Sequence, residues 1–397
     1  MKKIKQIILK LQSVTLKFNL PPKKKLIVFD DERFEDLKNI VKGHDYFLLQ
    51  TRFENVDLLY INPIIIFKSL INYRENLWTS YLISLIKIIS PKIILTHIDI
   101  SLKFFEIANK LSNRIDFFAI QSGARYEFSE KSKDDKKISQ QVYIPNFFCF
   151  GQHEVEDYRK KNINVNNFFP VGSMRFANFI TEKKINSISK IENKYDICLI
   201  SDGVTLGTSK KYGVTGFEDE MAQFIKYVIK YALEEKKKII ISFKRLSSSI
   251  KNLEAELEFY KKYLNSFEYD FIINNSTLNF KNSTYLSYEL MLQSIITIST
   301  FSTMLREGLS YSKKILSVNL MNNDIFEFPI EGICKLKKCS YYEFKKRVDE
   351  IFSLSNKEYF SRIEKLPTYF MEFNSSVSAI DKIRKKISDY VDTNNVI

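Results

Sequence analysis

A chain of 397 residues, of which 45% are hydrophobic and 27% charged, is too long for one ordinary core, because single domains most often hold roughly 100 to 200 residues. These fractions are typical of soluble globular proteins and exclude global disorder. The formal net charge of +14 would suit nucleic acid, but the lysines are scattered without a long basic block, so we expect no nucleic-acid partner. The charge instead favours anionic membrane surfaces or phosphorylated ligands.

The N-terminal segment MKKIKQIILKLQSVTLKFNLPPKKK starts with basic residues, as a secretory signal does. Lys10, Gln12 and Lys17 interrupt its apolar stretch and no small-residue cleavage site follows, so we expect a cytoplasmic protein. Its Ile and Leu spacing indicates a short amphipathic helix that either packs on the first domain, the favoured alternative, or lies peripherally at the inner membrane surface. Since no span of about 20 apolar residues is uninterrupted, we predict no transmembrane helix.

The first half of the chain alternates short apolar runs with helical patterns. The runs that we predict to be strands are 25–31, 46–51, 91–99, 115–123 and 146–151. Continuous apolar strands that alternate with helices indicate a parallel sheet covered on both faces.

The same alternation restarts after a polar stretch. We predict strands at 195–203, 237–245, 269–275, 294–300 and 313–320. Between them, helices are predicted at about 215–235, 249–263, 283–292 and 302–311. From about residue 340 onward the pattern is helical only.

This order predicts an α/β protein of two Rossmann-like, doubly wound domains that face a cleft, with a helical C-terminal tail. We expect the N-terminal domain at 1–180, a linker at 181–194, the C-terminal domain at 195–340, and tail helices at 341–397 that pack back on the N-terminal domain. The four cysteines and three histidines are widely spaced, so we predict no metal site.

Ligands of open parallel sheets bind beyond the carboxyl ends of the strands, which makes residues at those ends the candidates. In TISTFSTMLREGLSYSKKIL, a strand that ends in Ser299 and Thr300 leads into a helix that begins at about Ser302. The unpaired N–H groups of a helix N-terminus favour an anion such as phosphate. The alternative, favoured by this segment alone, is that Ser302 or Thr303 only caps the helix and that Glu307 is an exposed helix residue.

Two further strand ends in the second half carry charged groups. Lys244 and Arg245 follow a strand, and two adjacent cations there could bind a phosphate, with solvated surface charge as an equal alternative. Asp202 and Gly203 end the first strand of this half, where glycine permits close approach of the backbone to a ligand. An ordinary turn explains this pair equally well.

Strand ends in the first half supply a second group of candidates. Gln121, Gly123 and Arg125 end one strand, and Arg125 could hold a carboxylate or a phosphate. His97 and Asp99 follow another strand and form the best local acid–base pair. The acidic run DDE at 30–32, where the first predicted strand ends, competes with them as the origin of a base.

No glycine-rich dinucleotide fingerprint, phosphate-loop lysine motif or serine-hydrolase elbow occurs in the sequence. Two segments instead resemble GT-B type glycosyltransferases. In NFFCFGQHEVEDYRKKNINVNNFFPVGSMR, residues 146–175, a strand ending in glycine is followed by a helix and by a VGS-containing strand that enters the linker. SYELMLQSIITISTFSTMLREGLSYSKKIL, residues 287–316, is similar to the donor-binding element of that family.

More narrowly, the combination resembles bacterial surface-carbohydrate enzymes, including capsule and lipopolysaccharide (O-antigen) transferases that use CMP-Kdo-type sugars. IISFKR stands where many of those enzymes carry Lys-His-Pro, and departs from it at Arg245 and Leu246. The resemblance implies a metal-independent glycosyltransferase that needs no cofactor. Its donor substrate would be a nucleotide sugar such as a CMP-ulosonic acid, bound by the C-terminal domain. Its acceptor would be a surface polysaccharide or a lipid-linked glycan, bound by the N-terminal domain.

The resemblance also assigns roles to residues. Donor binding falls to strand ends of the second half, with Glu307 on the nucleotide ribose: Lys244, Arg245, Ser299, Thr300, Ser302, Thr303 and Glu307. Sugar or acceptor binding falls to one strand end of the first half: Gln121, Gly123 and Arg125. For catalysis, His97 or Asp99 would deprotonate the acceptor in an inverting mechanism, whereas Asp202 would act as the nucleophile in a retaining one.

Two other functions stay open. A nucleotide-sugar 2-epimerase-like enzyme would share the two halves and the Glu-bearing helix, and would turn over its substrate without an acceptor. A non-catalytic protein that binds sugar nucleotides or polyanions would show no donor turnover.

Overall fold

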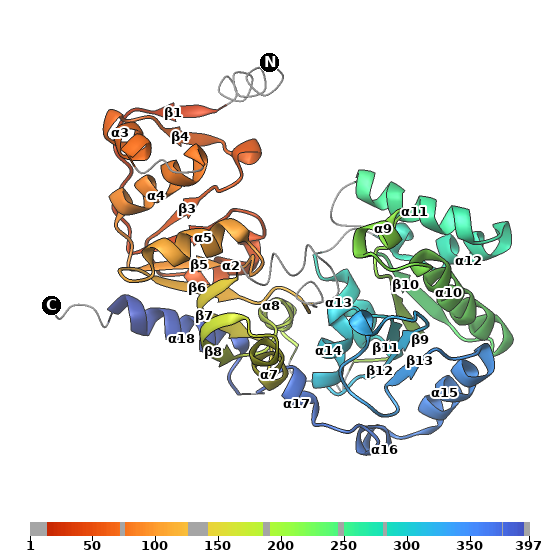
Figure 1. The fold of residues 1–397 in the computed structure, drawn as a ribbon. Helices are drawn as coiled ribbons and strands as arrows, with labels where there is room; N and C mark the ends of the chain where they lie inside the picture. Colours follow the sequence, from red (N-terminus) through yellow and green to blue (C-terminus); the bar gives the residue numbers. More distant parts are fainter. Residues whose placement is uncertain are drawn as a thin grey trace. The chain divides into compact units, whose positions relative to one another are not determined.

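The computed structural model describes residues 14–71, 76–125, 142–185, 191–244, 250–280, 284–374 and 376–392. The chain divides into two compact units, which can be followed in Figure 1. Unit 1 consists of Met1–Ser122, Lys136–Asn178 and Asn374–Ile397, and unit 2 of Gly123–Asp135 and Phe179–Phe373. Each unit is built on one large parallel sheet, as the alternating pattern predicts.

Unit 1 contains a six-stranded sheet in the order β3-β2-β5-β6-β7-β8, in which every pair of strands is parallel. A separate parallel pair joins β1 to β4. Its elements are β1 (Thr15–Lys17), β2 (Leu26–Phe29), α2 (Phe34–Val41), β3 (Tyr46–Leu49), η1 (Phe53–Asn55), β4 (Leu58–Tyr60), α3 (Pro63–Ile71), α4 (Leu77–Ile89), β5 (Ile93–Thr96), α5 (Leu102–Leu111), β6 (Asp116–Ile120), β7 (Tyr143–Cys149), α7 (Gln152–Lys160), β8 (Asn164–Pro170) and α18 (Ala379–Asp392), with α8 (Met174–Glu182) running across the boundary.

Both faces of the unit 1 sheet are buried, which explains why its strands are apolar without interruption. On one face, Val28 and Phe118 belong to a core that α2 and α18 complete. On the other face, the ring of Phe104 from α5 packs edge-on against Phe29 at 5.4 Å and Phe117 at 5.6 Å, measured between ring centroids. Residues that are neighbours along a strand point to opposite faces, so each strand serves both cores.

Unit 2 contains a five-stranded parallel sheet in the order β10-β9-β11-β12-β13. Its elements are β9 (Tyr195–Ile200), α9 (Thr208–Tyr212), α10 (Phe217–Glu234), β10 (Ile239–Ser242), α11 (Ile250–Tyr263), α12 (Ser266–Asn274), η3 (Thr277–Asn279), α13 (Leu286–Leu292), β11 (Ser294–Ser299), α14 (Thr303–Ser310), β12 (Lys314–Asn319), η4 (Asp324–Phe326), β13 (Lys335–Lys337), α15 (Tyr341–Ser353), α16 (Asn356–Ser361) and α17 (Pro367–Phe370). Ile197 and Leu199 of β9 join the main core of the unit, and Cys198 and Ile200 join a second cluster on the opposite face with α13.

One predicted strand is wrong. The run YDFIINN, predicted as a strand at 269–275, lies almost wholly in helix α12. A capping box starts this helix: the Asn265 side chain accepts from the backbone N–H of Glu268, and the Glu268 carboxylate accepts from the backbone N–H of Asn265. Periodicity alone cannot assign a short apolar run to a helix or to a strand. The capping box is the sequence signal that identifies this run as a helix.

The C-terminal tail is shared between the units rather than packed as a whole on the N-terminal domain. Phe344, Val348 and Ile351 of α15 are buried in the core of unit 2. The hydroxyl of Tyr359 in α16 donates to the backbone oxygen of Ile315 in β12 at 2.6 Å. Of the tail helices in the described residues, α18 alone belongs to unit 1, where its apolar face covers the sheet.

Near the N-terminus, residues 1–13 of the expected amphipathic helix lie outside the described residues. Thr15–Lys17 forms strand β1, in which Leu16 pairs with Leu59, so the helical expectation is wrong for this part of the segment.

Among the helices of the described ranges, none is both long and apolar enough to cross a membrane. Within the same ranges, no group of three or more His, Cys, Asp or Glu side chains is arranged to hold a metal ion.

All four cysteine thiols are expected to resist labelling in the folded protein. Cys149, Cys198, Cys334 and Cys339 are free and buried, and burial raises the pKa of Cys198 to about 12 and that of Cys339 to about 11. At pH 8 in the native protein, an aromatic disulfide reagent should therefore release little chromophore within minutes. In 6 M guanidinium chloride, the same assay should report four thiols per chain, and rapid native labelling would contradict this burial.

Candidate functional site

Each large sheet has one point at which the order of its strands reverses. In unit 2, β9 pairs with β10 on one side and with β11 on the other. In unit 1, β2 pairs with β3 on one side and with β5 on the other. Ligands of open α/β sheets bind beyond the carboxyl ends of the strands at such a switch point. The candidates are therefore the residues that follow β9 and β11 in unit 2, and β2 and β5 in unit 1.

Asp202 follows β9, and its buried carboxylate holds the loop after β11. The hydroxyl of Ser299 lies 3.1 Å and 3.2 Å from the two carboxylate oxygens, and the backbone N–H of Thr300 donates to Oδ2 at 3.0 Å. Burial raises the pKa of Asp202 above its ordinary value, and Lys244 and the hydrogen bonds from this loop oppose that rise. We interpret Asp202 as a residue that positions the loop between β11 and α14.

Lys244 follows β10 and brings a cation to the same group of strand ends. Its backbone N–H donates to Ser201 Oγ at 3.2 Å, and its ammonium donates to the backbone oxygen of Asp202 at 3.3 Å. The ammonium also lies 5.9 Å from the centroid of the Phe301 ring, within the range of a cation–π contact. The other predicted cation, Arg245, lies outside the described residues.

Ser299 and Thr300 face the interior of unit 2, each with an exposed fraction of at most 1%. Ser299 Oγ lies 3.0 Å from the backbone oxygen of Ile200, and Thr300 Oγ1 donates to Met221 Sδ over 3.4 Å. These hydroxyls therefore join neighbouring elements of the unit. A ligand at this edge of the sheet would meet the backbone of the loop before it met either hydroxyl.

Ser302 is the N-cap of α14, as the sequence indicates, and its side chain accepts from the backbone N–H of Met304 at 3.3 Å. Thr303 Oγ1 accepts from the backbone N–H of Ala124 at 2.9 Å. A methyl group placed on Gly123 would lie 3.5 Å from the same oxygen. The structure thus places the backbone around Gly123 against the first turn of α14, two segments that are far apart in the sequence.

The expected sugar-binding residues do not stay together. Gln121 is buried in unit 1, where its amide oxygen accepts from the backbone N–H of Phe150 at 2.8 Å and extends the pairing of β6 with β7. Gly123 and Arg125 belong to unit 2, and the Arg125 side chain is half-buried. Gln121 therefore has a structural role in the sheet of unit 1.

Glu307 is buried, with an exposed fraction of 3%, so the alternative of an exposed helix residue is wrong. The hydroxyl of Tyr288 from α13 donates to Glu307 Oε1 at 2.9 Å. A buried carboxylate that accepts a hydrogen bond from a tyrosine is more restricted in direction than a surface one. This restriction suits a carboxylate that orients a ligand hydroxyl.

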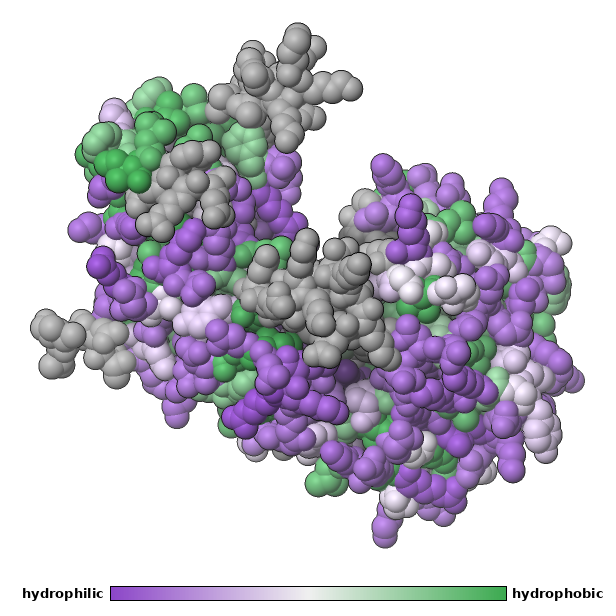
Figure 2. Space-filling model, in the orientation of Figure 1, coloured by the Kyte–Doolittle hydropathy of each residue, from purple (hydrophilic) through white to green (hydrophobic). Residues whose placement is uncertain are grey.

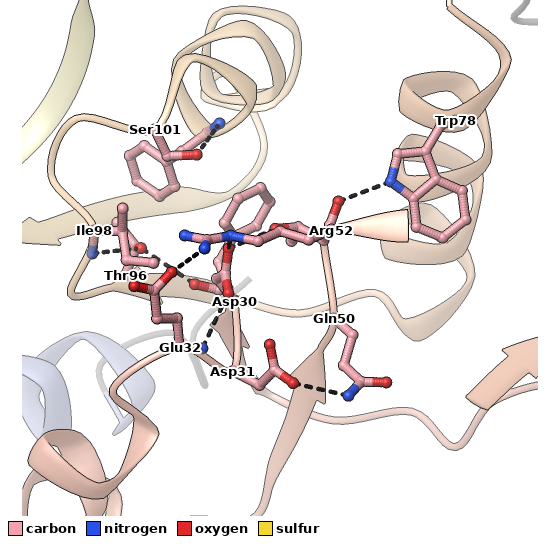
Figure 3. A network of polar contacts seen from close by, with 12 residues as sticks. Asp30, Asp31, Glu32, Gln50, Arg52, Trp78, Thr96, Ile98 and Ser101 are labelled. Atoms are coloured by element: carbon pink, nitrogen blue, oxygen red, sulfur yellow. Dashed lines mark hydrogen bonds and ion pairs between the residues drawn. The ribbon is translucent and has the colours of Figure 1, made fainter. Parts of the chain in front are cut away.

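At the switch point of unit 1, the central residue is Asp30, directly after β2. Its exposed fraction is 3%, and its backbone φ of 79° lies in the left-handed region that non-glycine residues rarely adopt. Oδ2 accepts from Thr51 Oγ1 at 2.8 Å and from Arg52 Nε at 3.1 Å, and Oδ1 accepts from the backbone N–H of Glu32 at 3.0 Å. Figure 3 shows the Arg52 guanidinium directed at Asp30 and at the carboxylate of Glu32, with which it also forms an ion pair.

The predicted acid–base pair His97 and Asp99 is also buried after β5, and both side chains contact other protein groups. His97 Nδ1 lies 3.7 Å from the carboxylate of Asp36 on α2. Asp99 Oδ1 accepts from the backbone N–H and the hydroxyl of Ser122, at 3.1 Å and 3.0 Å. The Asp99 contacts hold the ends of β5 and β6 together, and the His97 contact joins β5 to α2.

A cavity of about 1000 Å³ opens at this end of unit 1. Asp30 and Arg52 line it, whereas His97 and Asp99 are absent from the described residues that form its wall. The acidic run after β2 was recognised in the sequence, but Arg52 was not, because a single arginine in a loop carries no spacing signal. Pairing of β2 with β3 brings the two residues together, since each follows the end of its own strand.

No protein-family model matches the sequence, and no curated protein does. Solved structures do match in fold. The chain resembles Methanocaldococcus jannaschii UDP-GlcNAc 2-epimerase in complex with UDP-GlcNAc and UDP, with 13% identity, 91% of this chain and 98% of that chain covered, and a TM-score of 0.52. It resembles S. aureus MnaA with UDP at 12% identity, 94% and 98% coverage, and a TM-score of 0.51. The wall teichoic acid polymerase TagF matches at 11% identity, 99% and 94% coverage, and a TM-score of 0.46. At these identities the likeness concerns the fold alone: the chain has a GT-B-like fold of two Rossmann-like units and a helical C-terminal segment.

Proposed function

We propose that the protein is a glycosyltransferase that moves a sugar from a nucleotide-activated donor to a surface polysaccharide or lipid-linked glycan. The observation that carries this proposal is that each unit has its own polar switch point, and that unit 1 adds a cavity large enough for a second substrate. An enzyme that joins two substrates needs two such binding regions. A CMP-ulosonic acid is the specific donor suggested by the sequence resemblance, and assembly of capsule or lipopolysaccharide in the cytoplasm, at the inner membrane surface, is the corresponding process.

In this proposal, unit 2 binds the nucleotide. Lys244 and the backbone N–H groups at the start of α14 hold the phosphate, and Glu307 accepts a hydrogen bond from a ribose hydroxyl. Support comes from the positions of Lys244 after β10 and of the start of α14 after β11, since these two strands flank β9. Glu307 lies further along α14. Ser299, Thr300 and Asp202 then act indirectly, because their hydrogen bonds shape the loop that presents those N–H groups.

The proposed base is Asp30 rather than His97, Asp99 or Asp202. Asp30 lines the cavity, is held by Thr51 and Arg52, and has a strained backbone of the kind that persists at functional sites. Asp99 is instead bonded to the loop after β6.

The reaction then balances without a metal or cofactor. The acceptor hydroxyl passes its proton to Asp30 while its oxygen bonds to the anomeric carbon. The bond from that carbon to the donor phosphate breaks, and the phosphate leaves with the electron pair. Lys244 and the N-terminal end of α14 stabilise the negative charge that grows on the leaving phosphate.

A second candidate is a nucleotide-sugar 2-epimerase-like enzyme. The fold likeness to two proteins whose structures hold UDP favours it. Such an enzyme would use the same nucleotide contacts in unit 2 and would need no acceptor. A non-catalytic sugar-nucleotide or polyanion-binding protein would use them without turnover.

Thermal-shift measurements with CMP, UDP, GDP and dTDP test the nucleotide site. One of them should raise the melting temperature, because a ligand at 100 times its Kd stabilises the folded state by about 2.7 kcal/mol. The matching nucleotide sugar should then release its nucleotide only when an acceptor glycan is added. Turnover without acceptor, with a change of configuration at C2, would favour the epimerase, and no stabilisation by any of the four would contradict the nucleotide site.

Glu307→Gln is the matching residue-level test, because glutamine keeps an oxygen for the Tyr288 hydroxyl while removing the charge. It should weaken nucleotide binding about tenfold, equivalent to about 1.4 kcal/mol, at nearly unchanged thermal stability. Glu343→Gln, in the capping box that starts α15, serves as the control in the same unit and should leave nucleotide affinity unchanged.

A further inference from the structure

The cavity of unit 1 has an apolar wall and a polar end. Ile66, Leu70, Leu77, Trp78 and Ile98 contribute to the wall, from α3, α4 and the loop after β5. Its volume of about 1000 Å³ is at the upper end of small-molecule sites, which hold about 300–1,000 Å³. Most sugars are polar over their whole surface, so a wall of this kind does not suit a glycan by itself.

The polar end contains Asp30, Arg52 and Glu54, together with Lys103 from the first turn of α5. Arg52 is neutralised by Asp30 and Glu32. Lys103 is half-buried and burial lowers its pKa, while the nearby carboxylates of Glu106, Glu54 and Asp30 oppose that shift. Among the described residues, Lys103 forms no hydrogen bond and no ion pair within 4 Å. The nearest acid on its own helix, Glu106, is bonded to Lys110. A half-buried cation whose neighbouring carboxylates do not hydrogen-bond to it can still accept an anionic group of a ligand in the cavity.

The apolar wall continues onto the surface through α3. Ile64, Phe67 and Ile71 are 49%, 65% and 65% exposed, and Ile66 and Leu70 of the same helix line the cavity. Figure 2 shows hydrophobic side chains gathered over this part of unit 1. Together they form a continuous apolar path from the cavity to the exposed face of α3, longer than a compact ligand needs.

We propose that this cavity binds a lipid-linked acceptor: a single hydrocarbon chain lies along α3 and the wall around Trp78, and the phosphate that carries the chain lies at Lys103. This inference rests on the proposed function, in which it narrows the acceptor to the lipid-linked class. It places the sugar end of the acceptor at Asp30, where its hydroxyl meets the proposed base.

The test uses the full chain and decyl phosphate below its critical micelle concentration. Trp78 is the one tryptophan of the sequence, and its indole N–H donates to the backbone oxygen of Thr51 at 2.7 Å, so its emission reports on the cavity. We expect a saturable change in emission with one site per chain by calorimetry. Inorganic phosphate, which lacks the chain, should leave the emission unchanged, and decyl maltoside, which lacks the charge, should bind more weakly.

Paired variants separate the two ends of the site. Lys103→Met should weaken decyl phosphate binding about tenfold and leave decyl maltoside unaffected, whereas Lys110→Met on the same helix should change neither. Ile66→Asn should weaken both ligands, whereas Leu233→Asn, which replaces an equally exposed aliphatic residue on α10 of unit 2, should change neither. The two asparagine variants should melt within a few degrees of each other, which controls for folding.

The inference would be overturned if decyl phosphate showed no saturable binding, or if the Lys103→Met protein bound it equally well. It would also be overturned if light scattering showed a stable dimer that Phe67→Asn dissociates and decyl phosphate does not. Thermal stabilisation by nucleotide, measured on the same samples, distinguishes failure of the lipid-linked acceptor proposal from failure of the proposed transferase function. Nucleotide binding without decyl phosphate binding contradicts only the lipid-linked acceptor. Decyl phosphate binding with no response to any nucleotide contradicts the proposed transferase instead.

Discussion

Asp30→Asn is expected to slow sugar transfer by about 10²- to 10⁴-fold, the usual contribution of a general base, while leaving nucleotide stabilisation unchanged. Asparagine tolerates the left-handed φ of 79° better than most residues and keeps an oxygen for the hydroxyl of Thr51. It cannot take up a proton at neutral pH, however. The measurement is the single-turnover rate with acceptor and saturating nucleotide sugar, together with the thermal shift produced by the nucleotide.

Glu32→Gln is the matched control, because it removes the other carboxylate that pairs with Arg52 and stands two residues away. Its transfer rate should stay within about threefold of the parent. If both variants lower the transfer rate by the same factor, the loss comes from the disturbed position of Arg52 and not from removal of a base. If Asp30→Asn retains full activity, Asp30 is not the base.

Gly332→Ala is expected to lower the free energy of unfolding of unit 2 by about 3 kcal/mol or more, since backbone strain and overpacking each contribute about 1–3 kcal/mol. Gly332 has a φ of 124°, and a methyl group there would lie 2.3 Å from the backbone oxygen of Arg362 and 3.1 Å from Ile363 Cα. Backbone atoms cannot rotate away as a side chain would. Gly332 also forms a bridge to Ile363, so the clash would separate two paired segments.

Gly213→Ala isolates the conformational part of this effect, because φ there is 65° and nothing lies within 4 Å of the added methyl group. It should lower stability by only about 1 kcal/mol. Urea unfolding followed by far-UV circular dichroism reports both units, and Trp78 emission reports unit 1. Equal midpoints for the two variants would show that the segment around Arg362 moves aside.

Local patterns were sufficient to predict most of the fold. Uninterrupted apolar runs identified nearly all strands of both large sheets, because a strand that is buried on both faces is apolar at every position. The cap at Ser302 was also readable, since an N-cap depends on its own helix alone. The error at α12 arose where a short apolar run satisfies helix and strand equally, and where the capping box of Asn265 and Glu268 went unused.

The contacts among the candidate site residues were predictable only in part. Asp202 and Lys244 do meet, because they follow adjacent parallel strands. The direction of each side chain was not predictable. Ser299 turns its hydroxyl inward to Asp202, and Glu307 is buried against Tyr288, a residue of another helix.

The sequence by itself determined the two parallel α/β halves and the strand ends that carry polar groups, because periodicity and capping act over a few neighbouring residues. Only the tertiary structure decided that Arg52 holds Asp30, that α15 joins unit 2 while α18 joins unit 1, and that α3, Trp78 and Lys103 enclose one cavity. Those relations depend on which strands pair and which helix faces find a partner, and such contacts join residues that the sequence keeps far apart.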